Sequence, residues 1–249
     1  GKPILWYVLN ILKKKNFNHF ILPTGYKGEM IKRYLKKNKN LNKNYKIDII
    51  STGTNSSIAK RIFKIKDYIK SNNFVLLNGD AIFNFDLFDI FNKHVRKKQD
   101  ITFLTCDVQF TFGVIGVKNK KIVNFERDII FESVKIKKDK SFLGYIYSGM
   151  AIFNKKILKN KFKNLINFEK DFYPSLIKKY KSDFKGIKGF WRSIDNQKDI
   201  NFLNNKKNKY EYTQIRKLAK TKFWNIMKNK KKILVVAAHP DDEILGCGG

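Results

Sequence analysis

The first hundred residues alternate between two kinds of segment, and this alternation constrains the fold more than any other feature. Short apolar runs, typical of buried strands, are separated by longer segments whose apolar residues recur at helical spacing. The expected strands are 20–23, 45–51, 74–77 and 101–105, and the expected helices are 4–15, 27–37, 54–68 and 87–98. This alternation predicts an α/β fold with a mostly parallel sheet and helices on both faces.

The pattern changes after Phe112, where short strands separated by turns indicate antiparallel pairs. The expected strands there are 113–117, 122–125, 134–137, 145–153 and 184–187, with helices at 157–160 and 172–180. A charged segment at 204–209 indicates a boundary, and the apolar run 233–237 predicts a new strand. We therefore expect a main domain at 1–203, a basic linker or helix at 204–231 and a truncated second α/β domain at 232–249.

The chain is strongly basic, with 53 Lys and Arg against 21 Asp and Glu and a formal net charge of +32. Such an excess is common in proteins that bind nucleic acids or anionic membranes. Here the lysines are spread along the chain together with Asn, Ile and Phe, as a bias in genome composition would also produce. We expect no specific nucleic-acid partner, and binding to a polyanion stays open as an alternative.

The number of cysteines and the length of the apolar stretches indicate the cellular compartment. The two cysteines, Cys106 and Cys247, are too few and too isolated for a disulfide framework, which fits a reducing cytoplasm. The longest apolar stretches fall far short of the roughly 20 residues that cross a bilayer, so we expect no membrane span.

Two carboxylates stand where an α/β sheet binds ligands. Asp80 follows Gly79 at the carboxyl end of an expected buried strand, and ligands collect at that edge of open α/β sheets. Asp195 likewise follows an apolar run, a few residues after Gly189. A carboxylate in such a place can hold Mg²⁺ against phosphate oxygens. Each residue, taken alone, is equally compatible with a helix cap or a turn.

Considered together, the motifs of the main domain occur in a recognisable order. They are Gly1-Lys2-Pro3-Ile4-Leu5, Gly25-Tyr26-Lys27-Gly28, Thr52-Gly53-Thr54-Asn55, Gly79-Asp80, Phe112-Gly113-Val114, Phe125-Glu126-Arg127, Tyr147-Ser148-Gly149, Phe168-Glu169 and Phe190-Trp191 with Asp195. In this order residues 1–203 resemble the sugar-phosphate nucleotidyltransferases, especially the glucose-1-phosphate cytidylyltransferase-like branch. The resemblance implies a Rossmann-like, GT-A-like fold. It also implies that a nucleoside triphosphate and a sugar 1-phosphate are converted to an NDP-sugar and pyrophosphate.

The same resemblance implies roles for single residues. Asp80 and Asp195 would be the Mg²⁺ ligands, and Arg127 would be the catalytic cation on the sugar phosphate. The implied substrate-binding positions are Gly53, Asn55, Ser57, Gly79, Gly113, Glu126, Arg127, Tyr147, Gly149, Glu169 and Trp191. Because a sugar-phosphate oxygen attacks the α-phosphorus directly, no protein nucleophile is needed. This agrees with the lack of a convincing Ser/His/Asp or Cys/His arrangement, and His19 and His94 are interpreted as ordinary helix-end or surface residues.

The chain also departs from the family pattern. The family's Gly-rich triphosphate loop, with its following Arg, would precede Gly1, so we expect this fragment to be inactive on its own. Residues 56–60 replace a more Gly-rich stretch that meets the base, which leaves the nucleotide open. A non-catalytic sugar-nucleotide-binding or scaffolding module is therefore the alternative, and a homo-oligomer stays open.

The C-terminus carries a second motif. A strand-like run leads into His239-Pro240-Asp241-Asp242-Glu243, which resembles the opening of the PIG-L/LmbE family of zinc-dependent N-deacetylases. The resemblance implies that His239 and Asp242 bind Zn²⁺ and that Asp241 is the general base. The family's third ligand would lie beyond Gly249, so we expect weak zinc binding and a parent protein with both activities.

Overall fold

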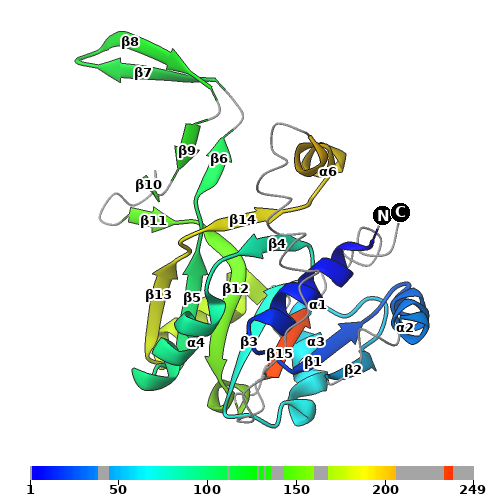
Figure 1. Ribbon diagram of the computed structural model, residues 1–249. Coiled ribbons are helices and arrows are strands. Elements are labelled where there is room, and N and C mark those ends of the chain that lie inside the picture. The colour runs from blue at the N-terminus through cyan, green and yellow to red at the C-terminus, as the bar shows by residue number, and fades with distance from the viewer. Residues whose placement is uncertain are drawn as a thin grey trace.

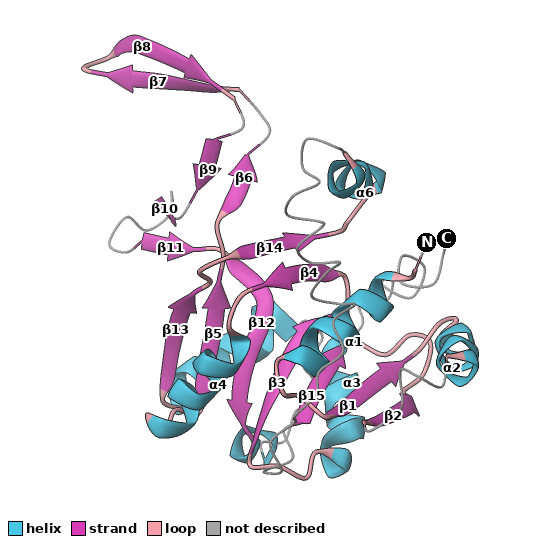
Figure 2. Ribbon diagram, in the orientation of Figure 1, coloured by secondary structure: helices cyan, strands magenta, loops and turns pink. Residues whose placement is uncertain are grey.

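The computed structural model describes residues 2–38, 45–110, 113–127, 129–131, 133–135, 143–159, 168–205 and 233–237. Its centre is a seven-stranded sheet with the order β13-β5-β12-β3-β15-β1-β2 (Figures 1 and 2). These strands are β1 (His19–Thr24), β2 (Lys46–Ser51), β3 (Asn73–Asn78), β5 (Ile101–Thr105), β12 (Tyr147–Asn154), β13 (Ser182–Gly186) and β15 (Ile233–Ala237). Only β12 runs antiparallel to its neighbours in this sheet, so the predicted α/β fold with a mostly parallel sheet is confirmed.

Helices cover both faces of the sheet, and each face has its own apolar core. The helices are α1 (Ile4–Lys14), α2 (Gly28–Lys37), α3 (Ile58–Ile65), α4 (Leu87–Arg96), α5 (Tyr173–Lys179) and α6 (Gln197–Asn204). In Figure 1, α1 and α4 lie in front of the sheet and α3 lies behind it. Because successive strand residues face opposite sides, Val75 and Leu77 of β3 join the core under α1 and α4, whereas Phe74 and Leu76 join the core under α3 and α5.

Local sequence signals set the helix ends. Ser57 caps α3 by accepting a hydrogen bond from the Lys60 N–H at 3.4 Å, so this helix begins at Ile58 and not at residue 54. Asp86 caps α4 in the same way, accepting from the Asp89 N–H at 3.0 Å. Within the described ranges, none of the helices is long and apolar enough to cross a membrane.

Antiparallel pairs follow the first hundred residues, as the change of pattern predicted. They are β6 (Val108–Phe110) with β9 (Ile129–Phe131), β7 (Val114–Lys118) with β8 (Lys121–Glu126), and β10 (Ser133–Lys135) with β11 (Leu143–Tyr145). A further antiparallel pair joins β4 (Ala81–Asn84), which lies within the first hundred residues, to β14 (Phe190–Ser193). A 3₁₀ turn at Lys155–Lys159 stands where a helix was expected, and a π-helical turn at Phe168–Phe172 precedes α5.

Strand β15 has the predicted bounds but an unexpected place. The sequence assigns it to a truncated second domain, whereas the structure places it in the middle of the main sheet, parallel to β1 and β3. Its backbone pairs with both neighbours, through Ile233 with His19 on one side and with Phe74 on the other. The physical reason is the demand of buried backbone groups for partners, since β1 and β3 are not paired to each other. A second domain at 232–249 stays a prediction.

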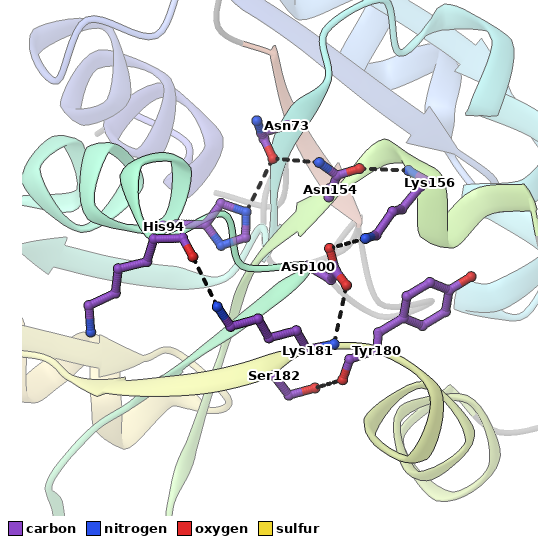
Figure 3. A network of polar contacts seen from close by, with 9 residues as sticks. Asn73, His94, Asp100, Asn154, Lys156, Tyr180, Lys181 and Ser182 are labelled. Atoms are coloured by element: carbon purple, nitrogen blue, oxygen red, sulfur yellow. Dashed lines mark hydrogen bonds and ion pairs between the residues drawn. The ribbon is translucent and has the colours of Figure 1, made fainter.

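His94, in the last turn of α4, is buried in a polar network (Figure 3). Its Nδ1 lies 2.8 Å from the Thr102 hydroxyl and its Nε2 lies 3.2 Å from Asn73 Oδ1. Asn154 donates to the same Asn73 oxygen at 3.3 Å. Burial lowers the pKa of His94 to about 4, although Asp100 raises it in part. His94 is therefore a buried, neutral structural residue and not a surface residue.

We predict that acid destabilises the protein through His94. The pKa falls from 6.5 when unfolded to about 4 when folded, so the unfolded state takes up the proton first. The contribution is fully present above pH 6.5 and is lost as the pH falls towards 4, by about 3 kcal/mol at most. In urea unfolding between pH 7 and 4, His94→Gln should lose less stability than the wild type. An equally steep loss in the variant would contradict this.

Candidate active site

One edge of the sheet collects the carboxyl ends of its central strands. Thr24 and Ser51 end β1 and β2 as a register pair, and Asn78 ends β3 opposite the last residue of β15. The Thr52 N–H donates to the Thr24 carbonyl at 2.8 Å, which ties the loops after β1 and β2 together. Open α/β sheets bind ligands at such an edge.

Asp80 and Asp195 meet at this edge. Residues 79 and 80 connect β3 to β4, and β14 pairs with β4 so that Ser193 lies opposite Ala81. Beyond this pair the Ile194 N–H donates to the Asp80 carbonyl at 3.1 Å. The structure therefore brings together the backbone segments that carry Asp80 and Asp195, which are far apart in the sequence. Their role as metal ligands remains a prediction.

The loop that carries Asp195 is fixed by Asp199, a residue that the sequence-based predictions missed. Asp199 Oδ2 accepts from the N–H groups of Asp195 at 3.1 Å and Asn196 at 3.3 Å. Its other oxygen accepts from Arg192 at 3.0 Å. Asn196 and Asp199 form a capping box at the start of α6, a spacing that the sequence does display.

The donor set at Asp80 and Asp195 fits Mg²⁺. Asp80 is buried and Asp195 is exposed, and Oδ1 of Asp195 accepts a hydrogen bond from the Ser193 hydroxyl at 2.7 Å. No group of three or more His, Cys, Asp or Glu that could hold a metal occurs in the part of the chain that the structure describes. Mg²⁺ commonly binds one or two carboxylates and completes its shell with water and substrate phosphates. The two residues therefore suit a metal that arrives with a phosphate ligand.

Arg61 shapes the neighbouring loop, 52–57. The side chain is fully buried, its Nε donates to the Ser56 carbonyl at 3.0 Å, and its Nη1 donates to the Pro23 carbonyl at 3.4 Å. A Cβ added to Gly25 would lie 2.6 Å from Arg61 Nη2, so the turn after β1 needs glycine there. Arg61 thus links the turn after β1 to the loop after β2.

The predicted base-binding residues of that loop differ in availability. Gly53, with a φ of 98°, and Asn55 are exposed at the edge of the sheet. Ser57 is half-buried and its hydroxyl caps α3. Gly53 and Asn55 are thus exposed, whereas the Ser57 hydroxyl caps a helix, and base binding by all three residues stays a prediction.

Two predicted sugar-pocket residues stand at the start of β12, on the same edge. Gly149 has a φ of 73°, and a Cβ there would lie 2.8 Å from Asn78 Nδ2, so only glycine fits this close approach. The Tyr147 hydroxyl lies 2.7 Å from the Tyr173 hydroxyl, and burial raises the pKa of both. Tyr147 therefore contributes to an aromatic cluster with Phe103, whose ring centroid is 5.9 Å away.

Of the remaining predicted residues, those of the β7–β8 hairpin lie apart from Asp80 and Asp195. Gly113 precedes β7, and Glu126 and Arg127 end the β7–β8 hairpin, which projects from the body and away from β4 and β14 in Figure 1. Glu169 is exposed in the turn before α5. Trp191 is half-buried on β14, opposite Phe83. His239, Asp241 and Asp242 lie outside the described residues.

Comparison with known proteins identifies relatives. A family model described as nucleotidyl transferase matches residues 1–209. A probable glucose-1-phosphate cytidylyltransferase of Bacillus subtilis (strain 168) is 29% identical over 231 residues, covering 82% of this chain and 84% of that protein. The D-glycero-alpha-D-manno-heptose 1-phosphate guanylyltransferase of Aneurinibacillus thermoaerophilus is 30% identical over 176 residues, covering 69% and 70%.

Solved structures agree on the fold. The crystal structure of HddC from Yersinia pseudotuberculosis superposes with a TM-score of 0.59 at 22% identity, covering 81% of this chain and 84% of that chain. A second structure of HddC, in complex with GMP-PN, gives a TM-score of 0.58 at 21% identity. At this level of identity the likeness shows a common fold.

We predict that Asp199→Ala loosens the Asp195 loop. The variant removes the acceptors of two backbone N–H groups and of Arg192, and should lower the free energy of unfolding by about 1–2 kcal/mol. The amides of Asp195 and Asn196 should exchange hydrogen faster. The matched control is Asp89→Ala, which removes an exposed carboxylate from the first turn of α4. Equal exchange at Asp195 in wild type and Asp199→Ala would contradict the anchoring role.

Proposed function

Because the chain belongs to the nucleotidyl transferase family, we propose that it transfers a nucleotidyl group to a sugar 1-phosphate and releases pyrophosphate. The names of the two relatives, a cytidylyltransferase for glucose 1-phosphate and a guanylyltransferase for a heptose 1-phosphate, support this reaction class. The observation that carries the proposal is the meeting of Asp80 and Asp195 at the carboxyl edge of the sheet.

The chemistry requires alignment and charge neutralisation more than covalent help. When bound, Mg²⁺ would neutralise the charge of the phosphates between the attacking and leaving groups. Asp80, at the end of a buried strand, and Asp195, on a loop anchored by Asp199, would hold it. Both are supported by rigid elements, which suits a reaction that depends on positioning two anionic substrates. No side chain forms a bond to substrate.

The loops beside the carboxylates would bind the two substrates. Gly53 and Asn55 are exposed on the loop held by Arg61, and we assign them to the base side. Gly79 directly precedes Asp80, and Gly149 packs against Asn78 at the end of β3, so both lie at the same edge of the sheet. The roles proposed for Gly113, Glu126 and Arg127 rest on motif order alone.

The identity of the base is left to experiment. The two relatives name cytidylyl and guanylyl transfer, and residues 56–60 of this chain lack the family's extra glycines. Pyrophosphate release should therefore be assayed with each common nucleoside triphosphate and a set of sugar 1-phosphates. A complete protein that binds sugar nucleotides but never releases pyrophosphate would be a binding module, and the transferase proposal would be wrong.

In the complete protein, Asp80→Asn and Asp195→Asn should each lower kcat/KM by about 10²- to 10³-fold, because each removes a charge that neutralises phosphates in the transition state. Raising the Mg²⁺ concentration should recover part of the loss. Asp67→Asn, which changes an exposed carboxylate beyond α3, is the matched control and should leave kcat/KM unchanged. Full activity of either site variant would rule out the metal role of that residue.

We further propose that His239-Pro240-Asp241-Asp242-Glu243 belongs to an N-deacetylase domain of a bifunctional protein. The support is the motif alone, with His239 and Asp242 as zinc ligands and Asp241 as the base. The motif offers two candidate protein donors, His239 and Asp242, and catalytic zinc sites commonly use three. A separate deacetylase domain would also require residues 233–237 to leave their pairing with β1 and β3.

Zinc titration of this chain, followed by calorimetry, tests the second proposal. We expect weak binding that His239→Ala changes by less than about threefold, because two ligands without a folded core bind zinc poorly. Tight one-to-one binding that is lost in His239→Ala would contradict this expectation. The complete protein should bind zinc tightly through the same histidine.

A further inference from the structure

The β7–β8 hairpin is the part of the molecule that projects furthest from its body in Figure 1. Among the described strands, β7 and β8 pair only with each other, in a two-stranded sheet. Ile115 lies opposite Phe125 and Val117 lies opposite Ile122, with a register shift between Gly116 and Val117. A two-stranded hairpin is marginal in water unless one face is covered.

The hairpin is apolar on one face and polar on the other. Directly opposed residues share a face, and so do residues two apart, which places Ile115, Val117, Ile122 and Phe125 together. The other face carries the pairs Val114–Glu126, Gly116–Asn124 and Lys118–Lys121. This alternation is the pattern of a sheet with one buried face.

The polar side chains of the other face contact one another or are exposed to solvent. Asn124 Nδ2 donates to Glu126 Oε1 at 2.7 Å, and the Asn124 side chain lies over Gly116, where an added Cβ would meet its Oδ1. Lys118 and Lys121 are exposed beside the turn. This face needs no further cover.

The apolar face is exposed as well. Its four residues are strongly exposed: Ile115 55%, Val117 63%, Ile122 73% and Phe125 65%. At such exposures, side chains of this size present on the order of 100 Å² each, or roughly 400–500 Å² together. An apolar patch of that size on one face is typical of an interaction site.

We propose that the apolar face of the β7–β8 hairpin binds the same face of a second copy of this chain. A flat apolar face is self-complementary about a two-fold axis. Two copies would bury roughly 1,000 Å², the lower bound for a specific interface. The proposal does not depend on the transferase reaction.

The net charge of the chain distinguishes binding to a second copy from binding to an anionic surface. With a formal net charge of +32, two copies repel each other at long range, so salt should strengthen the dimer by screening that repulsion. Binding to an anionic lipid surface or a polyanion would weaken with salt. The turn at the projecting end of the hairpin is Lys118-Asn119-Lys120-Lys121. Its three lysines oppose insertion of the hairpin tip into a bilayer.

Sedimentation of the full chain over a range of concentrations and salt tests the proposal. We expect a monomer–dimer equilibrium that tightens between 50 and about 500 mM salt, as screening requires. Val117→Thr with Ile122→Thr keeps the β-branched shape but removes the apolar contact, and should raise the dimer Kd at least about tenfold. Because these side chains are exposed in the monomer, the melting temperature should be unchanged at protein concentrations well below the dimer Kd, where both proteins are monomeric.

The matched control replaces the neighbouring pair on the polar face, Lys118→Thr with Lys121→Thr, and should dimerise at least as well as the wild type. A wild type that stays monomeric, or an apolar-face variant that dimerises as tightly as the wild type, would overturn the proposal. So would a monomer that binds phosphatidylserine vesicles through these residues and is released by salt, because that outcome assigns the face to lipid.

Discussion

The pairing of β4 with β14 is the contact on which the candidate site depends. β4 carries the chain out of the central sheet directly after Asp80, and its residues Ile82 and Phe83 are buried. β14 lies along it, and the hydrogen bond from the Ile194 N–H to the Asp80 carbonyl sets Asp195 beside Asp80. The two residues are thus positioned by the pairing of the largely buried β4 with the half-buried β14.

A second constraint is that the backbone groups of β1 and β3 need a strand between them. β1 and β3 do not pair with each other, and β15 satisfies the backbone groups of both. The apolar, β-branched sequence of residues 233–237 was enough to predict a strand with the observed bounds. It was not enough to predict neighbours, because parallel pairing is decided by which buried strands lack partners, a property of the whole sheet.

The same distinction between local and long-range information applies to the candidate site. Period and turn signals predicted the α/β alternation, and the order of motifs predicted that Asp80 and Asp195 belong together. Asp199 was missed although the spacing of its capping box is visible in the sequence. A capping box predicts the start of a helix, but it does not predict that Asp199 also binds the backbone N–H of Asp195. The burial of His94 was missed because its partners, Thr102 and Asn73, come from two other strands. The sequence likewise predicted strands at 113–117 and 122–125, but not that their common apolar face is exposed.

A double-mutant cycle of Asp80→Asn and Asp195→Asn in the complete protein tests the central claim most directly, with kcat/KM for pyrophosphate release as the readout. If both carboxylates serve one metal-bound phosphate, the double variant should lose about as much activity as the more damaged single variant, because removing either already disables the unit. Losses that add in free energy would mean that the two residues act independently, and would contradict a shared site at this edge of the sheet.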